Sequence, residues 1–253
     1  MAKLRVFLLS LVIVFGGFVS KSFSETTDET NILGAGVLIS SSPYKDHDMK
    51  VWPVPIISWK NKNFFIKGTE AGWIAYENDN FRADVLVKPH LMGYDSGDSS
   101  FLAGMEDRNF SIDGGGKLTW KIPQVKDLDL SLTLVTDLLN EYQGHEAVLG
   151  LTKVCKGDIY QIQSSVGVKW ESQDLVKYYY GVRAGEITSS RPSYDGADAF
   201  DPYVQLGFFL GISKDLIFVG QFTADYLASQ ITDSPIVDES HILTGVVGIA
   251  KRF

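Results

Sequence analysis

The chain has 253 residues, of which 45% are hydrophobic and 12% aromatic, and this composition excludes an intrinsically disordered protein. Its 31 acidic residues outnumber the 23 basic ones, and the resulting net charge of −8 disfavours nucleic acid as a partner. The single cysteine, Cys155, excludes an intrachain disulfide and every metal site that needs several cysteines.

Residues 1–24 have the pattern of a secretory signal peptide. Lys3 and Arg5 precede an apolar run over 6–19, and small residues stand just before Glu25, as expected at a cleavage point. A membrane anchor is the alternative, but a helix needs about 20 apolar residues to span a bilayer, and this run is shorter. The sequence therefore predicts export of a mature domain that begins at Glu25.

Hydrophobic and polar residues alternate along many later stretches of the chain. Between Tyr160 and Glu171 the even positions are mostly apolar and the odd positions mostly polar, as on a β-strand with two unlike faces. A short polar break and a second alternating stretch over 175–185 predict a β-hairpin. In chain order the predicted strands cover 32–40, 50–59, 63–76, 81–93, 110–122, 128–137, 145–154, 160–171, 175–185, 202–212, 216–226 and 241–253.

Strand length and aromatic positions favour a membrane barrel over a soluble β-sandwich. Many predicted strands have about ten residues, near the length that crosses a bilayer at a tilt, whereas sandwich strands average about five or six. Aromatic residues such as Trp52, Trp59 and Trp170 lie near strand ends, where interfacial girdles form. Unpaired backbone groups are costly in lipid, so the sheet must close. We therefore predict an all-β, antiparallel transmembrane β-barrel of about 12 strands over residues 25–253.

Two features follow from a barrel. The last predicted strand ends on Phe253, the expected membrane-insertion signal for the barrel-assembly machinery, with outer-membrane lipids around the apolar face. Charged residues on the polar side of the strands should face the lumen, either as a solvated wall with cross-strand ion pairs or as a selectivity ring of mixed sign for small solutes. The candidates are Arg82, Lys88, Asp129, Lys169, Arg183 and Asp225.

No motif in the sequence carries enzymatic chemistry. His145 and Glu146 lack the second histidine of a zinc helix, and the glycines before Lys117 lack the remaining residues of a phosphate loop. Asp84 and His90 share one side of a predicted strand but would lie about 20 Å apart along it. We therefore expect no catalytic residue, cofactor or metal. The alternative is a catalytic site assembled from residues on several strands.

Several segments resemble the MipA/OmpV family of Gram-negative outer-membrane proteins over essentially the whole mature chain. The most specific of them contains Gly104, Met105 and Arg108. The others are 33–36 followed by Tyr44, 53–59, Asp137, 162–170, Tyr194, 234–235 and Phe253. The resemblance implies a non-enzymatic outer-membrane scaffold or anchor for murein enzymes, namely a lytic transglycosylase and a peptidoglycan synthase. The alternative is a narrow osmotic-stress-type porin for small solutes.

The segment 94–109 is long for its predicted position. Counting strands back from the C-terminus places 172–174 and 213–215 on the periplasmic side, with the longer breaks 186–201 and 227–240 outside. The same count places 94–109, with Gly104, Met105 and Arg108, on the periplasmic side. There the segment would contact periplasmic enzymes or fold back to plug the lumen. A miscounted strand in the middle of the chain is the alternative.

Overall fold

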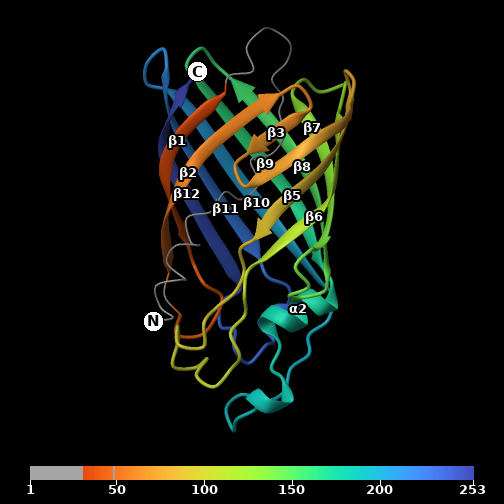
Figure 1. Cartoon of the computed structure of the whole chain (residues 1–253), viewed down its shortest axis with the longest axis vertical. Helices are drawn as coiled ribbons and strands as arrows, with labels where there is room; N and C mark the ends of the chain where they lie inside the picture. The colour runs from red at the N-terminus through yellow and green to blue at the C-terminus, as the bar shows by residue number, and fades with distance from the viewer. Residues whose placement is uncertain (1–30, 48) are drawn as a thin grey trace.

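A computed structural model describes residues 31–47 and 49–253, and in these residues twelve antiparallel strands form a closed barrel (Figure 1). Each strand pairs with its neighbours in sequence, and β1 closes the barrel against β12. The predicted fold class and strand number are thus confirmed. The signal peptide predicted over 1–24 lies outside the described residues and stays a prediction.

The bounds of the elements are close to the predicted ones except in two places. The strands are β1 Ile32–Ser40, β2 Lys50–Asn61, β3 Phe64–Lys67, β4 Glu70–Glu77, β5 Phe81–His90, β6 Ser111–Lys121, β7 Leu128–Asp137, β8 His145–Lys156, β9 Tyr160–Glu171, β10 Ala199–Gly211, β11 Leu216–Tyr226 and β12 His241–Arg252. The helices are α2 Gln173–Tyr180, the single turn α3 Ser229–Thr232 and a 3-10 turn over Ala184–Glu186. None of the helices in the described residues is long and apolar enough to cross a membrane.

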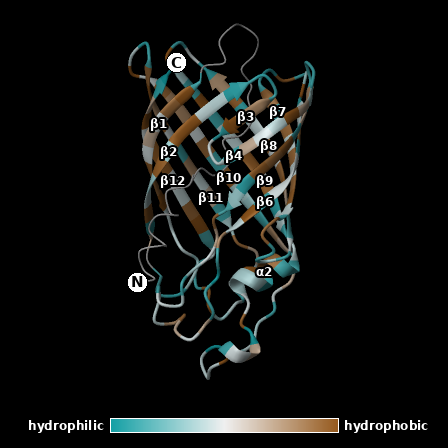
Figure 2. Cartoon of the chain, viewed as in Figure 1, coloured by the Kyte–Doolittle hydropathy of each residue, from teal (hydrophilic) through white to brown (hydrophobic). Residues whose placement is uncertain are grey.

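Side chains alternate between the outside and the inside of the barrel. On β9, Ile162 and Val166 are exposed on the outer surface, while Gln163 and Ser165 are buried inside. Hydrophobic and hydrophilic residues recur in turn along the strands (Figure 2). A closed sheet with an apolar outer surface satisfies its backbone groups without water, as a bilayer requires.

The stretch 63–76, predicted as one strand, is two strands. β3 and β4 pair with each other across a two-residue turn at Gly68 and Thr69, where Gly68 has φ +59°. Glycine adopts this left-handed conformation without steric cost, so the chain reverses direction there. The outward-facing side changes from even positions on β3, such as Phe64, to odd positions on β4, such as Trp73, so one alternating strand does not describe this stretch.

The prediction of a strand over 175–185 is wrong, because the structure has no strand there. Residues Gln173–Tyr180 form helix α2, which buries Leu175, Val176, Tyr179 and Tyr180 on one side. These four positions lie on one face of a helix, but the same stretch also alternates like a strand. It is too short to distinguish the helical period of 3.6 residues from the strand period of 2. Contacts with other loops, described below, favour the helix.

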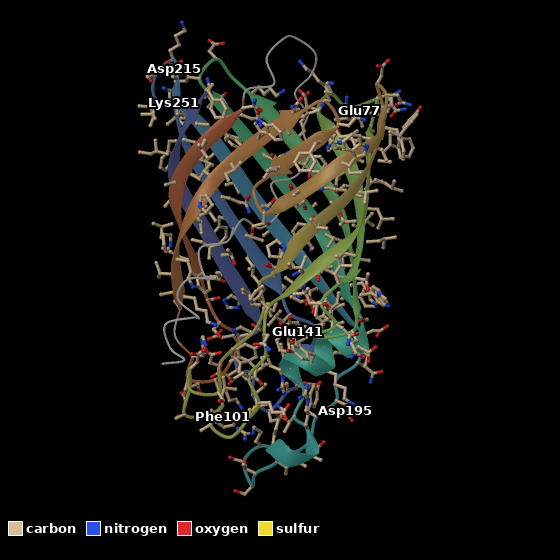
Figure 3. All side chains as sticks on the ribbon, viewed as in Figure 1. Glu77, Phe101, Glu141, Asp195, Asp215 and Lys251 are labelled. Carbon is tan, nitrogen blue, oxygen red and sulfur yellow. The ribbon has the colours of Figure 1, made fainter. Side chains whose placement is uncertain are left out.

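The connections at the two ends of the barrel differ in length. Apart from the turn 68–69 between the short strands β3 and β4, the short ones lie at the end that carries the C-terminus, here called the turn end, and are 62–63, 78–80, 122–127, 157–159 and 212–215. The longer ones lie at the opposite end, here called the loop end, and are 41–49, 91–110, 138–144, 172–198 and 227–240. Figure 3 labels Glu77, Asp215 and Lys251 at the turn end, and Phe101, Glu141 and Asp195 at the loop end.

This arrangement corrects the predicted position of 94–109. In bacterial outer-membrane barrels short turns face the periplasm and long loops face outward. The segment 94–109 lies within the loop that joins β5 and β6 at the loop end, so its predicted periplasmic position is wrong, as is that of 172–174. The false strand over 175–185 exchanged the two sides for every connection between it and the predicted strand 63–76. Because 63–76 is in fact two strands, the connections before it return to the correct side.

Candidate functional site

Five loops at the loop end pack together into one apolar cluster, here called the loop cap. Its buried members are Tyr44, Tyr94, Leu102, Met105, Tyr142, Leu175, Val176, Tyr179, Tyr180, Val182, Ala199, Ile231, Ile236 and Val237. Apart from Ala199, the first residue of β10, they come from loops that leave the barrel at separate points around its rim. They therefore meet across the mouth, and the loop cap covers this end of the lumen.

Arg108 joins the loop 91–110 to the loop 172–198. Its side chain is fully buried, and its Nε donates a hydrogen bond to the backbone oxygen of Tyr178 at 2.6 Å. One terminal nitrogen donates to the backbone oxygen of Glu106 at 2.8 Å, and the other donates to both carboxylate oxygens of Glu186 at 2.9 and 3.0 Å. The guanidinium also lies over the rings of Tyr94 and Tyr178. Every side of this cation is thus in contact with the loop cap.

The rest of the family-like segment is buried beside Arg108. The thioether of Met105, which is 5% exposed, accepts a hydrogen bond from the hydroxyl of Tyr94 at 3.7 Å. Gly104 has φ +83°, a conformation that favours glycine, and so lets the chain turn into the loop cap. The structure therefore places Gly104, Met105 and Arg108 at the loop end, with the latter two side chains inside the loop cap.

Burial and hydrogen bonding set the charge states in the loop cap. Burial raises the pKa of the Tyr94 hydroxyl to about 12, so this hydroxyl stays a donor. Burial alone would also raise the pKa of Glu186, but its carboxylate accepts hydrogen bonds from the backbone amides of Arg183 and Glu106 and from Arg108. These bonds outweigh burial and hold the pKa of Glu186 below its ordinary value of 4.5.

Acid should loosen the loop cap before it affects the barrel. Because the pKa of Glu186 is lowered by folding, the stability it contributes is complete above pH 4.5 and is lost as the pH falls through the lower folded value. We expect hydrogen exchange of the amides in 181–186 to rise below about pH 4.5, after correction for intrinsic rates, while strand amides stay protected. Glu186→Gln should remove most of this acid response, and an unchanged response in that variant would contradict the assignment.

Five of the six predicted lumen charges lie on the inner side of the barrel. Arg82 bonds Asp84 at 2.7 Å, Lys88 bonds Glu146 at 2.5 Å, and Lys169 bonds Asp225 at 3.1 Å. Asp129 is also on the inner side and is 1% exposed. The sixth, Arg183, is not on a strand. It lies in the loop after α2, where its exposed guanidinium pairs with Glu106.

A polar cluster beneath the loop cap was missed from the sequence. His90 on β5 contacts Asp113 on β6 through Nδ1 at 3.0 Å, and the hydroxyl of Tyr142 donates to the other oxygen of Asp113 at 2.5 Å. From the sequence, only Asp84 on the same strand is a candidate partner for His90. Asp113 lies on another strand, and its approach depends on strand pairing. Ser111 lies directly across from His90, but its hydroxyl donates a hydrogen bond to Asp137. His90 therefore does not activate Ser111 as a nucleophile.

The inner surface of the barrel has an apolar wall and a charged wall. The apolar wall comes from β1, β2, β11 and β12 and consists of Ile32, Leu38, Val54, Ile56, Ile217, Val219, Val246 and Ala250. The ion pairs of the charged wall lie on β5, β8, β9 and β11. In the part of the chain that the structure describes, no three histidine, cysteine, aspartate or glutamate side chains are placed to hold a metal ion.

Comparisons with known proteins agree with this architecture. The profile of the family described as "MltA-interacting protein MipA" matches residues 33–253. The chain is 29% identical to the MltA-interacting protein of Escherichia coli K12, with both chains covered completely. It is 25% identical to the putative outer membrane protein YiaT of the same strain over 91% of this chain and 93% of that protein. Outer membrane protein OmpV of Vibrio cholerae is 27% identical over 59% of this chain and 57% of its own.

Solved barrels are more distant in sequence. The CymD monoaromatic hydrocarbon channel covers 90% of this chain and 89% of its own at 11% identity, with a TM-score of 0.45. The NanC porin covers 88% of this chain and all of its own at 10% identity, with a TM-score of 0.41.

Proposed function

This chain belongs to the family of the MltA-interacting protein MipA, and we propose that it acts in the outer membrane as a scaffold for enzymes that cut and build murein. The predicted family resemblance and outer-membrane location are confirmed. The observation that carries the proposal is the full-length match to a protein named for its interaction with MltA. The family also suggests a non-enzymatic protein.

The turn end is the surface that such partners would contact. Murein enzymes work in the periplasm, and the short connections of an outer-membrane barrel face that compartment. The longest of these connections is 122–127, where Gln124, Val125 and Lys126 are exposed. The family-like residues Met105 and Arg108 stabilise the loop cap at the opposite end and do not take part in this contact.

Site-specific cross-linking in whole cells tests the scaffold proposal. A photo-cross-linking residue at Gln124 should capture a lytic transglycosylase or a peptidoglycan synthase, because this exposed residue lies at the turn end, which the proposal places in the periplasm. The same residue at Ser189, which is exposed in the loop 172–198, is the matched control and should capture neither. The captured proteins are identified by mass spectrometry.

Each outcome of this experiment has a defined meaning. Capture from Gln124 alone supports a periplasmic scaffold. Absence of murein enzymes at Gln124 and at further exposed turn-end positions such as Asp79 and Lys214, in cells that contain these enzymes, contradicts it. Capture from Ser189 alone would mean that the assignment of the two ends is reversed.

A narrow channel for small solutes is the second candidate function, and the charged inner wall favours it. The loop cap lies across the mouth, so conduction requires the loop cap to open. Conductance steps of the purified barrel in a planar bilayer, larger when the loop cap is weakened, would support a channel. If the barrel shows no conductance steps with the loop cap intact or weakened, the channel is excluded and the scaffold remains as the proposed function.

A further inference from the structure

Four carboxylates and two lysines gather on the inner wall just below the loop cap. Glu146 on β8 lies directly opposite Glu171 on β9, and Lys169 on β9 lies directly opposite Asp201 on β10. Like charges placed directly opposite each other are destabilising unless cations lie between them. We call this group of residues the carboxylate cluster. It consists of Lys88, Glu146, Lys169, Glu171, Asp201 and Asp225.

The two lysines neutralise only half of these carboxylates. Lys88 bonds Glu146 at 2.5 Å, and Lys169 bonds Asp225 at 3.1 Å. The contact between Lys169 and the nearer oxygen of Glu171 is 3.9 Å, too long for a hydrogen bond. With four carboxylates and two ammonium groups, the carboxylate cluster has a formal charge of −2.

One buried oxygen of Glu171 and one of Asp201 have no hydrogen-bond partner among the described residues. The side chains are 6% and 1% exposed. The other oxygen of Asp201 accepts a hydrogen bond from the backbone amide of Ala228 at 2.7 Å. Glu171 lies opposite Ala199, so Glu171 and Asp201 are diagonal neighbours on the same inner face of β9 and β10. Two buried carboxylate oxygens without a hydrogen-bond partner are costly, so a cation bound between them would stabilise the carboxylate cluster.

Two tyrosines of the loop cap, Tyr180 and Tyr44, lie within electrostatic range of these carboxylates. Tyr180 is close enough to Glu171 and Asp201 to interact with both electrostatically, and its ring lies 5.9 Å from that of Tyr44. Burial, followed by the charge of Glu171, raises the pKa of Tyr180 well above its ordinary value, so the hydroxyl stays neutral. Carboxylates together with aromatic faces recognise ammonium groups by charge and by cation–π attraction.

We propose that Glu171 and Asp201, with Tyr180 and Tyr44 beside them, bind a small aliphatic amine. Ammonium groups already occupy the other carboxylates of this cluster, since Lys88 and Lys169 bond Glu146 and Asp225. Two unpaired oxygens and a charge of −2 match a diamine. The described residues offer no three-carboxylate arrangement for a metal ion, which favours an amine over a divalent metal. This site goes beyond the scaffold function and does not depend on it.

Calorimetric titration of the full-length mature protein in detergent with putrescine at pH 7.5 tests the site. Putrescine should bind the native protein, and Glu171→Gln combined with Asp201→Asn should weaken this binding by about tenfold or more, because both ionic partners are lost. Asp84→Asn is the matched control. It removes a buried inner carboxylate that is paired with Arg82, and it should leave putrescine binding unchanged.

Thermal denaturation gives a second readout that does not depend on heats of binding. Putrescine should raise the denaturation temperature of the native protein and of Asp84→Asn but not that of the double variant. Without amine, the double variant should be at least as stable as the native protein, since it lacks two buried carboxylates that each leave one oxygen without a hydrogen-bond partner. No binding to the native protein, equal binding to the double variant, or binding of magnesium in place of putrescine at these residues would each overturn the proposal.

Discussion

Replacing Arg108 by alanine should unfold the loop cap and leave the barrel closed. The variant leaves the carboxylate of Glu186 buried without its bidentate partner and leaves the backbone oxygens of Tyr178 and Glu106 without a donor. Removing one partner of a buried ion pair costs about 3–5 kcal/mol, because the other charge stays in a medium of low dielectric constant. Limited proteolysis should then cut the loops 91–110 and 172–198 much faster, with unchanged β-sheet circular dichroism.

The matched control for this variant is Arg183→Ala. Arg183 pairs with Glu106, but their side chains are 44% and 68% exposed, and exposed ion pairs contribute about 0.2–1 kcal/mol. Proteolysis of this variant should be close to that of the native protein. Equal effects of the two substitutions would mean that Arg108 acts only as a surface charge, contrary to its burial.

Placing arginine on the outer surface at mid-barrel should oppose folding in a bilayer. Val166 lies in the middle of β9 and faces outward beside Leu151 and Val204, all of them exposed. An arginine on the lipid face at the membrane midplane costs about 2–4 kcal/mol. We expect Val166→Arg to reduce the free energy of unfolding in lipid vesicles by this amount.

The same substitution at the membrane interface provides the control. Tyr160 begins β9 at the turn end, is 48% exposed compared with 53% for Val166, and faces the same side of the strand. The cost of arginine falls to about 0–1 kcal/mol near the interface, where the side chain reaches water. If Val166→Arg and Tyr160→Arg destabilise the barrel equally, the outer face is not buried in lipid at mid-height.

The barrel could be predicted from the amino-acid sequence alone. Lipid imposes the same alternation on every spanning strand, so the pattern repeats along the chain and is readable without knowing which strands pair. The alternation of β9, from Tyr160 to Glu171, and its counterpart on β5 correctly separated the outer residues from the inner ones, including Lys88 and Lys169. Family resemblance then added the outer-membrane location.

Only the tertiary structure decided the loop end and the contacts inside the barrel. The stretch 175–185 fits a strand and a helix equally well, and packing of Tyr179 and Tyr180 against other loops favours the helix. Arg108 and Glu186 are 78 positions apart in the chain, so no local pattern relates them. The carboxylate cluster likewise depends on strand register. Pairing between strands is set by closure of the whole sheet, which no single segment encodes.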